Sequence, residues 1–362
     1  MKKVVILSAF LSPLRSGAEA CAEEVALELS DKYDITIVTA RMHRDLPRED
    51  LLGGKVPVVR IGLGFGFDKW LFPFLAPFSV RACVGAPRCG AQDNDDPAII
   101  HAILETFAGL ALHLCKLIVP KLKRILTMQT TNRSFLKGMV VRSPDKVTAI
   151  SEALVKIAEE LGRNDVIKIS NGLHLGQIPV TEKERGRIVF VGRLEKMKGI
   201  DTLLTAFAKL KMYNVQCTIR VVGDGSERSR LEQLAIDLGI VEHVTFTGFL
   251  PVPDVYKEFA KAEIFCGLSR SEALGNVFLE AQAAGCAVIG TTVGGIPDII
   301  KDGETGLLVS SDDADAAADA LKKLLEDTSL LQKLAEEGKK NAQNYDWSKI
   351  AKEYESVYES FL

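Results

Sequence analysis

The 362-residue sequence lacks the cysteine patterns of disulfide-stapled domains and of zinc sites. Its seven cysteines are an odd number, and none of them forms a C-x-x-C pair. This pattern is typical of free thiols in a reducing compartment. We therefore expect a cytoplasmic protein, either in solution or attached peripherally to the cytoplasmic face of a membrane.

Long uncharged apolar runs are also missing. The most apolar region, 98–120, still contains Glu105 and Lys116. A charged side chain at the middle of a bilayer costs roughly 2.5–3.5 kcal/mol on insertion scales. We interpret this region as a strand followed by a buried helix, not as a membrane span. The net charge of −3 argues against general affinity for nucleic acids.

The chain has instead a regular alternation of short apolar runs and helical patterns. In the N-terminal half, strands are predicted at 4–9, 34–39, 98–103, 124–130 and 146–151, and the predicted helices include 16–29 and 152–161. Residues 62–97 are rich in aromatic residues, proline and glycine, and we assign them no regular structure. Strands that alternate with helices predict βαβ units and a parallel sheet.

The alternation restarts after residues 172–186, whose turn formers and charges predict an interdomain linker. Further strands are predicted at 187–192, 217–223, 243–248, 262–268, 287–291 and 306–309. We expect an α/β fold with two doubly wound, Rossmann-like domains, at 1–175 and 176–344. Residues 345–362 are predicted to form a helix that crosses back to the first domain.

The stretch SRSEALG, 269–275, links a predicted strand to a predicted helix. In open parallel sheets, ligands bind at the carboxyl ends of the strands. The free N–H groups of Gly275, Asn276 and Val277 point out of the helix start, where they favour an anion such as a phosphate. The loop therefore predicts a site for a phosphorylated ligand.

Two glutamates flank this helix start. Glu280 lies one turn into the helix, where a carboxylate can accept two hydrogen bonds from a ribose diol. Glu272 precedes the helix and would contact the group beyond the phosphates. The alternatives are structural, because Ser269-x-x-Glu272 also matches a capping box and Glu280 could be an ordinary exposed residue. The stretch alone does not decide between them.

Two basic residues follow the first strand of the same domain. Arg193 and Lys198 lie in RLEKMKG and should reach the same carboxyl edge as the glutamates. Two cations five residues apart are usually surface charges. Facing a helix N-terminus, however, they would complete a clamp that stabilises a departing diphosphate. In other enzymes, one well-placed donor of this kind lowers the activation barrier by about 3–4 kcal/mol.

Four segments, in order, resemble those of the family-four retaining glycosyltransferases with the GT-B fold (glycosyl transferases group 1): VGRLEKMKGIDTLL, VVGDG, HVTFTGFLP and SRSEALGNVFLEAQAAGCAVIGTTVGGIPDIIKDGETGLLV. The likeness is close over 187–310 and continues more weakly elsewhere, including KVTAISEAL and KISNGLHL. It implies two Rossmann-like domains that face a central cleft. It also implies transfer of a sugar from a UDP- or GDP-sugar, with retention at the anomeric carbon.

The resemblance implies a role for each candidate residue. Glu272 lies near the donor sugar and its reactive face, Glu280 holds the ribose, and Arg193 with Lys198 binds the diphosphate. Backbone contacts to sugar and phosphate are implied for four consecutive residues: Leu274, Gly275, Asn276 and Val277. No metal or other cofactor is implied, because the cations and the helix dipole take its place. No D-x-D or histidine cluster in the sequence demands a metal.

The first domain departs from the family pattern. Ser16 and Gly17 lie where the family has a glycine-rich loop that contacts the donor, and a plain N-cap at Ser16 is the alternative. His101 corresponds to a histidine that many members carry and is our candidate for catalysis, with a satisfied core histidine as the alternative. Ile103 and Gln129 stand where other members have histidines. The acceptor (a glycan, a lipid or a small molecule) is therefore left open.

Two features outside these motifs have competing interpretations. The aromatic stretch 64–78 either touches a membrane or forms a buried wall of the acceptor site, and the basic stretch 116–124 either assists at the membrane or is an ordinary helix end. We favour the second interpretation of each. Glycines that end strands, such as Gly223, Gly225 and Gly294, are usually turns, and ligand contact is the other interpretation.

Other activities use the same architecture. A nucleotide-sugar epimerase, a glycan phosphorylase or a non-catalytic nucleotide-sugar binder would share the fold, which by itself does not separate them. The spacing of the two glutamates disfavours the first two, and the complete set of Glu272, Lys198 and Arg193 disfavours the third.

Overall fold

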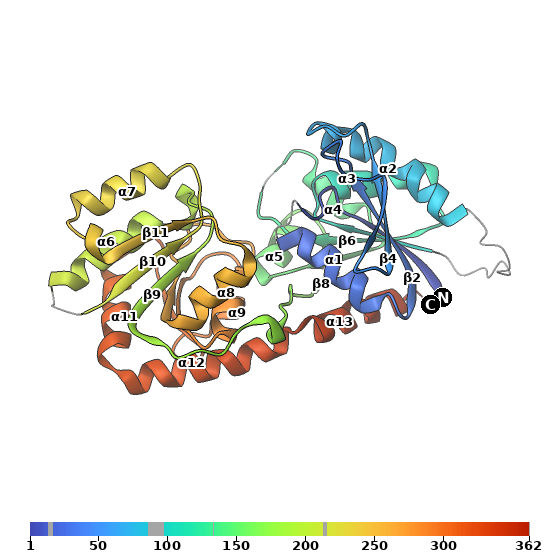
Figure 1. The fold of residues 1–362 in the computed structure, drawn as a ribbon. Helices are drawn as coiled ribbons and strands as arrows, with labels where there is room; N and C mark the ends of the chain where they lie inside the picture. Colours follow the sequence, from blue (N-terminus) through green and yellow to red (C-terminus); the bar gives the residue numbers. More distant parts are fainter. Residues whose placement is uncertain (14–16, 86–97, 133, 213–215, 362) are drawn as a thin grey trace. The chain divides into compact units, whose positions relative to one another are not determined.

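The computed structural model describes residues 1–13, 17–85, 98–132, 134–212 and 216–361. The chain divides into two compact units, of which unit 1 comprises Met1–Gly172 with Trp347–Leu362 and unit 2 comprises Leu173–Asp346. Each unit is built on one sheet with helices on both faces (Figure 1). The predicted α/β class with two Rossmann-like domains is confirmed.

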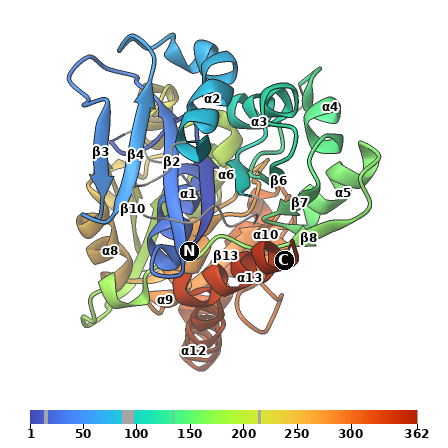
Figure 2. The same cartoon turned by 90° about the vertical axis from the view of Figure 1, so that its right-hand side faces the viewer.

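The sheet of unit 1 has eight strands in the order β3-β4-β2-β1-β5-β6-β7-β8. Their bounds are Lys2–Leu7 (β1), Tyr33–Ala40 (β2), Glu49–Leu52 (β3), Val56–Ile61 (β4), Ile99–Ile103 (β5), Lys123–Met128 (β6), Lys146–Ala149 (β7) and Val166–Lys168 (β8). Only β3 among them runs antiparallel, paired with β4 at one edge (Figure 2). Strand order reverses between β1 and β5, which is where the loops of a doubly wound sheet diverge.

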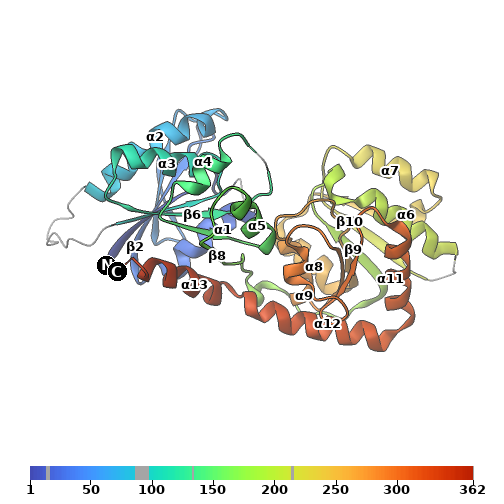
Figure 3. The same cartoon turned by 180° about the vertical axis from the view of Figure 1, so that it is seen from behind.

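The helices of unit 1 cover both faces of this sheet. They are α1 (Gly17–Leu29), α2 (Asp68–Gly85), α3 (Phe107–Ile118), α4 (Lys137–Arg142), α5 (Glu152–Glu160) and the C-terminal α13 (Trp347–Glu359). Helix α2 packs beside α3, and α1 packs beside α13 on the other face (Figure 3). The C-terminal helix therefore returns to the first sheet, as the sequence predicts.

Helix α2 corrects the prediction that residues 62–97 have no regular structure. It spans 68–85 although Pro73 and Pro77 lie inside it, and an interior proline is unfavourable in a helix by about 3 kcal/mol. The inward side chains Phe72, Ala76 and Val80 are each 0% exposed. Burial of this apolar side against the unit stabilises the helix in spite of its prolines. The prediction for 86–97 lies outside the described residues.

The sheet of unit 2 is all parallel, in the order β11-β10-β9-β12-β13-β14. Its strands are β9 (Glu184–Val191), β10 (Thr218–Val222), β11 (Val244–Gly248), β12 (Ala262–Cys266), β13 (Ala287–Thr291) and β14 (Leu307–Val309). The helices are α6 (Ile200–Met212), α7 (Arg228–Asp237), α8 (Val252–Lys261), α9 (Asn276–Ala283), α10 (Ile296–Ile299), α11 (Ala314–Glu326) and α12 (Thr328–Ala342). Strand order reverses between β9 and β12, so a ligand is expected beside their carboxyl ends.

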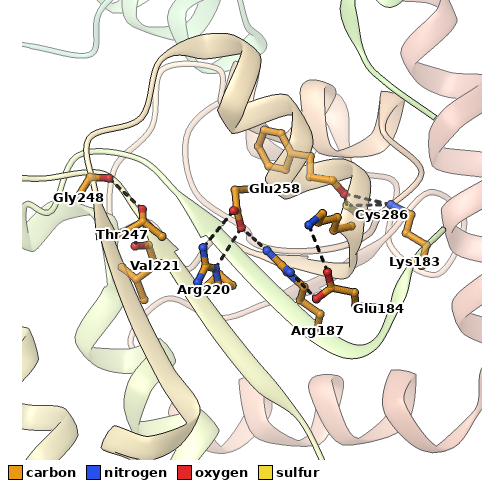
Figure 4. A network of polar contacts seen from close by, with 11 residues as sticks. Lys183, Glu184, Arg187, Arg220, Val221, Thr247, Gly248, Glu258 and Cys286 are labelled. Carbon is orange, nitrogen blue, oxygen red and sulfur yellow. Dashed lines mark hydrogen bonds and ion pairs between the residues drawn. The ribbon is translucent and has the colours of Figure 1, made fainter. Parts of the chain in front are cut away.

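A polar network ties the start of unit 2 to α8 and α9 (Figure 4). The Nζ of Lys183 donates to the carbonyls of Ala284 at 2.8 Å and Phe259 at 3.1 Å. It thereby caps the carboxyl ends of both helices, where a cation is favourable, although burial lowers the pKa of Lys183. Arg187 of β9 pairs with Glu258 of α8. From Leu173 onward, the predicted linker 172–186 is thus part of unit 2.

No described helix is both long enough and apolar enough to cross a bilayer.

Candidate active site

Two loops meet at the point where the strand order of unit 2 reverses. One follows β9 and contains the short 3-10 helix Lys196–Lys198, and the other follows β12. The N–H of Arg270 donates to the carbonyl of Met197 at 2.7 Å. Gly199 lies so close to the end of β12 that a Cβ there would be 1.9 Å from the carbonyl oxygen of Leu268. Contact between the loops therefore depends on glycine at position 199.

This contact brings two of the predicted residues together. The Nζ of Lys198 lies 2.6 Å from Oε2 of Glu272. The side chains are 18% and 16% exposed, so both are largely shielded but reachable from solvent. A hydrogen bond between two charged groups at this distance is among the stronger ones. The pair places one cation and one carboxylate at the same sheet edge, as the sequence predicts.

The helix that follows the second loop begins at Asn276. Its N-cap is Gly275, with φ of +96°, and the N–H of Phe278 donates to the Gly275 carbonyl at 2.9 Å. The N–H groups of Asn276 and Val277 belong to the first turn, where the helix itself provides no acceptor. Because the cap is a glycine in the left-handed region, the alternative of a capping box at Ser269-x-x-Glu272 is wrong.

The remaining predicted residues of unit 2 lie around this helix start. Glu280 is half-buried, one turn into α9, and Leu274 before the cap is buried. Arg193 lies two residues beyond β9, with a side chain that is 73% exposed and pairs with Glu195 at 2.8 Å. The side chain of Arg193 therefore lies mostly in solvent.

Glycines at the neighbouring strand ends hold the loops together. A Cβ at Gly223 would lie 1.9 Å from the carbonyl oxygen of Gly192, and one at Gly225 would lie 2.4 Å from that of Leu194. After β13, the N–H of Gly295 donates to the carbonyl of Glu272 at 3.2 Å. These glycines allow close approach between loops. The sequence identifies them only as strand ends, because the approaching residues are distant in the chain.

The candidate site residues of unit 1 are Ser16, Gly17 and His101. Ser16 lies outside the described residues, and Gly17 is the first residue of α1. His101 is 0% exposed within β5. Its Nδ1 is 2.8 Å from the Tyr358 hydroxyl and its Nε2 is 2.7 Å from that of Thr127. Both ring nitrogens are occupied, and burial lowers the pKa of His101 to about 3. This geometry fits the alternative of a satisfied core histidine.

Sequence reasoning missed a buried ion pair at the carboxyl edge of unit 1. Lys137 and Glu105 approach within 2.8 Å, with side chains 3% and 2% exposed. Glu105 also accepts from the backbone N–H groups of Gln129 and Thr130. The pair thereby fixes the loop after β6. The only available signal was a glutamate within the most apolar region of the chain.

The site in unit 2 can bind and stabilise a diphosphate. It offers an ammonium group at Lys198, a guanidinium group at Arg193 and first-turn N–H groups, and the helix dipole adds partial positive charge. Carboxylates at Glu272 and Glu280 can accept hydrogen bonds from hydroxyl groups. Within the described part of the chain, no three His, Cys, Asp or Glu residues group as metal ligands.

Comparison with known proteins identifies the matching part of the chain. Residues 177–341 match the model of the family Glycosyl transferases group 1. The chain is 36% identical, over 177 residues, to a D-inositol 3-phosphate glycosyltransferase of Corynebacterium aurimucosum. That alignment covers 47% of this chain and 42% of the relative. The chain thus matches less than half of that relative's length.

Solved structures resemble the whole chain. A sucrose-phosphate synthase from Thermosynechococcus elongatus superposes with a TM-score of 0.85 at 20% identity, covering 99% of both chains. HepE of Anabaena, in complex with UDP and glucose, superposes with a TM-score of 0.79 at 20% identity, covering 99% of this chain and 100% of HepE. At this identity the similarity is evidence of a shared fold.

Proposed function

We propose that this chain is a retaining glycosyltransferase, because residues 177–341 match the model of the family Glycosyl transferases group 1 and the whole chain has the GT-B fold. The donor is a UDP- or GDP-sugar, and the acceptor is a hydroxyl group of a glycan, a lipid or a small molecule. Unit 2 binds the donor and unit 1 binds the acceptor. Support for a nucleotide-sugar comes from HepE, which was solved with UDP and glucose.

The observation that carries the proposal is the pairing of Lys198 with Glu272 beside the start of α9. In the free protein, Glu272 neutralises Lys198 and fixes its position. A bound donor would place its diphosphate against Lys198, Arg193 and the N–H groups of Asn276 and Val277. These groups stabilise the negative charge that develops as the diphosphate leaves.

The two carboxylates have separate tasks in this arrangement. Glu272 lies beside the cation that binds the phosphates, so it contacts the attached sugar near its reactive carbon. Glu280 lies one turn further along α9 and accepts hydrogen bonds from the ribose hydroxyls. The backbone at Leu274 and Gly275 lines the path between them. Because the cations and the helix dipole provide the positive charge, we also propose that transfer needs no metal, so that EDTA leaves it unchanged.

Thermal unfolding with UDP, GDP and their sugars tests the donor site. A ligand at one hundred times its dissociation constant adds about 2.7 kcal/mol to the stability of the folded state. We expect stabilisation by the UDP or the GDP series and its loss in Glu280→Ala. The exposed Glu304 provides a control, since Glu304→Ala should bind the donor as the parent does. Absence of stabilisation by every nucleotide tested would contradict the proposal.

Product analysis with the stabilising donor separates the alternatives. A transferase forms a glycosylated acceptor, or slowly releases free sugar, with the anomeric configuration of the donor. An epimerase changes the free nucleotide-sugar without any acceptor, and a binder yields no product. We expect Glu272→Ala to slow transfer while donor binding persists.

A further inference from the structure

Unit 1 exposes a run of large apolar side chains along α2 and the loop before it. We call this run the aromatic face; its members are Phe65, Phe67, Trp70, Phe74, Leu75 and Phe78. On the helix, Trp70 is 63% exposed, Phe74 61% and Phe78 62%. Isolated exposed apolar residues are ordinary, but contiguous patches mark interaction surfaces. The favoured prediction of a buried wall is therefore wrong for these side chains.

The spacing of the exposed residues explains why they gather on one side. Trp70, Phe74 and Phe78 are four residues apart, so they line one side of the helix. The opposite side carries the buried residues Phe72 and Val80. Helix α2 is thus apolar on both sides. Its inner side is buried within unit 1, and on its outer side the ring of Trp70 contacts the edge of Phe107, with centroids 5.0 Å apart, while the Trp70 side chain remains 63% exposed.

The loop before α2 is anchored so that its aromatic rings have defined positions. Oδ2 of Asp68, which is 1% exposed, accepts from the N–H groups of Gly64 at 2.6 Å and Phe65 at 3.2 Å. The rings of Phe65 and Phe67 stack with centroids 5.4 Å apart. The fold therefore holds these aromatic side chains in place.

Basic residues border the aromatic face. The guanidinium of Arg44 lies 4.3 Å from the ring centre of Phe65, and Arg41 donates to the carbonyl of Leu46 at 2.7 Å, which orders the same loop. Along the loop and helix that carry the face, residues 63–81, the basic residues are Lys69 and Arg81 and the one acidic residue is the buried Asp68. The border of the face is thus positively charged.

We propose that the aromatic face docks unit 1 on an anionic lipid bilayer. Its rings enter the boundary between headgroups and acyl chains, and the bordering arginines contact lipid phosphates. Aromatic and cationic side chains are the usual anchors of proteins that lie on a membrane surface. Each basic residue near an anionic surface adds favourable attraction.

The positive charge around the aromatic face favours a bilayer over a second copy of the chain as the partner of this face. A twofold dimer brings the same patch of each copy together, so the two basic borders would face each other and repel. Anionic lipid is complementary to both the apolar centre and the basic border. The other basic stretch, 116–124, is not part of the proposal, because its Arg124 is buried and paired with Asp145 at 3.3 Å.

The chain offers its own probe of docking. It has two tryptophans, of which Trp70 is 63% exposed on the aromatic face and Trp347 is 3% exposed in α13. Vesicles of phosphatidylcholine with phosphatidylglycerol should shift the emission of the full chain to shorter wavelength and protect it from acrylamide. Pure phosphatidylcholine should have a much smaller effect. The measurement needs no substrate, so its outcome is separate from that of the proposed transfer reaction.

A matched pair of variants identifies the surface. The triple change Trp70→Ser, Phe74→Ser and Phe78→Ser should weaken co-sedimentation with the anionic vesicles at least about tenfold. The control triple Ile236→Ser, Val241→Ser and Phe249→Ser removes side chains of unit 2 that are 56%, 53% and 80% exposed. It should leave vesicle binding unchanged.

Several outcomes would overturn the proposal. These are no binding of the parent to either vesicle, equal binding to both lipids, or unchanged binding after the aromatic triple change. A dimer that the aromatic triple change dissociates, without vesicle binding by the parent, would assign the face to self-association instead.

Discussion

Gly294 lies directly against the backbone of Glu272. A Cβ at position 294 would be 1.7 Å from the carbonyl oxygen of Glu272, and Gly294 has a φ of +56°. Real side chains do not approach backbone atoms this closely, so any other residue must displace the loop. The position of the Glu272 carboxylate therefore depends on a glycine that follows a different strand.

The change Gly294→Ala should displace Glu272 and weaken nucleotide binding at the proposed donor site. We expect a loss of stability of more than about 2 kcal/mol, since overpacking adds about 1–3 kcal/mol to the cost of the left-handed backbone. Gly303→Ala is a matched control, because Gly303 has a φ of +72° and a Cβ added there would meet no atom within 4 Å. Calorimetry with the stabilising nucleotide measures both effects. Equal losses of stability in the two variants would show that backbone strain, and not the contact with Glu272, causes the loss.

Much of unit 2 could be predicted because its apolar strands recur in a regular pattern. The candidate ligand site comes from the same reasoning, since loops at the carboxyl ends of strands bind ligands and the candidate residues carry suitable charges. The sequence does not show which loops touch. Gly199 approaches Leu268, and Gly294 approaches Glu272, but nothing local to these glycines names the partner.

Unit 1 was harder to predict for physical reasons. In α2, aromatic residues on both sides and two prolines conceal the helical period, and only packing against the rest of the unit stabilises the helix. The setting of His101 depends on Tyr358, 257 positions later. A histidine within an apolar run could not be distinguished from a catalytic one until the helix that satisfies it was placed.

Lys198 provides a test of charge stabilisation in the reaction. We expect Lys198→Met to lower kcat by about 10²–10³, the usual cost of one lost donor to a developing anion. Lys196 lies in the same 3-10 helix and is exposed, so Lys196→Met removes a charge without removing the contact to Glu272. Steady-state kinetics give the kcat of each variant for comparison with the parent. Similar rates for the two would exclude a specific role for Lys198.

Lys137 and Glu105 should be strongly coupled in their contributions to the free energy of unfolding. Lys137→Met leaves a buried carboxylate without its cation, which costs about 3–5 kcal/mol. The double variant with Glu105→Gln should lose less than the sum of the single changes. Urea unfolding followed by tryptophan emission reports on unit 1, because Trp70 and Trp347 both lie there.

An exposed pair serves as the comparison for this cycle. Lys340 and Glu337 are 2.7 Å apart with side chains 66% and 44% exposed, and solvent screening leaves such pairs with little effect on stability. Lys340→Met should therefore have little effect on stability. Additive losses at Lys137 and Glu105 would contradict the coupling.

The buried His101 should make unit 1 sensitive to acid. Burial lowers the pKa of His101 to about 3 in the folded state, whereas an unfolded histidine titrates near about 6.5. Between these values the unfolded chain binds a proton that the folded chain does not. The stability due to neutral His101 is therefore complete above pH about 6.5 and falls by up to about 1.4 kcal/mol per pH unit as the pH decreases.

The variant His101→Gln removes this titration while it retains a donor and an acceptor for Tyr358 and Thr127. We expect it to be less stable than the parent at pH 7.5, with a difference that shrinks by about 2–3 kcal/mol at pH 4.5. Urea unfolding at each pH, followed by tryptophan emission, measures the difference. Parallel stability curves would mean that His101 takes up its proton in the folded state. Transfer by the folded variant at pH 7.5 tests the catalytic role as well, since a histidine that serves only the core leaves kcat near that of the parent.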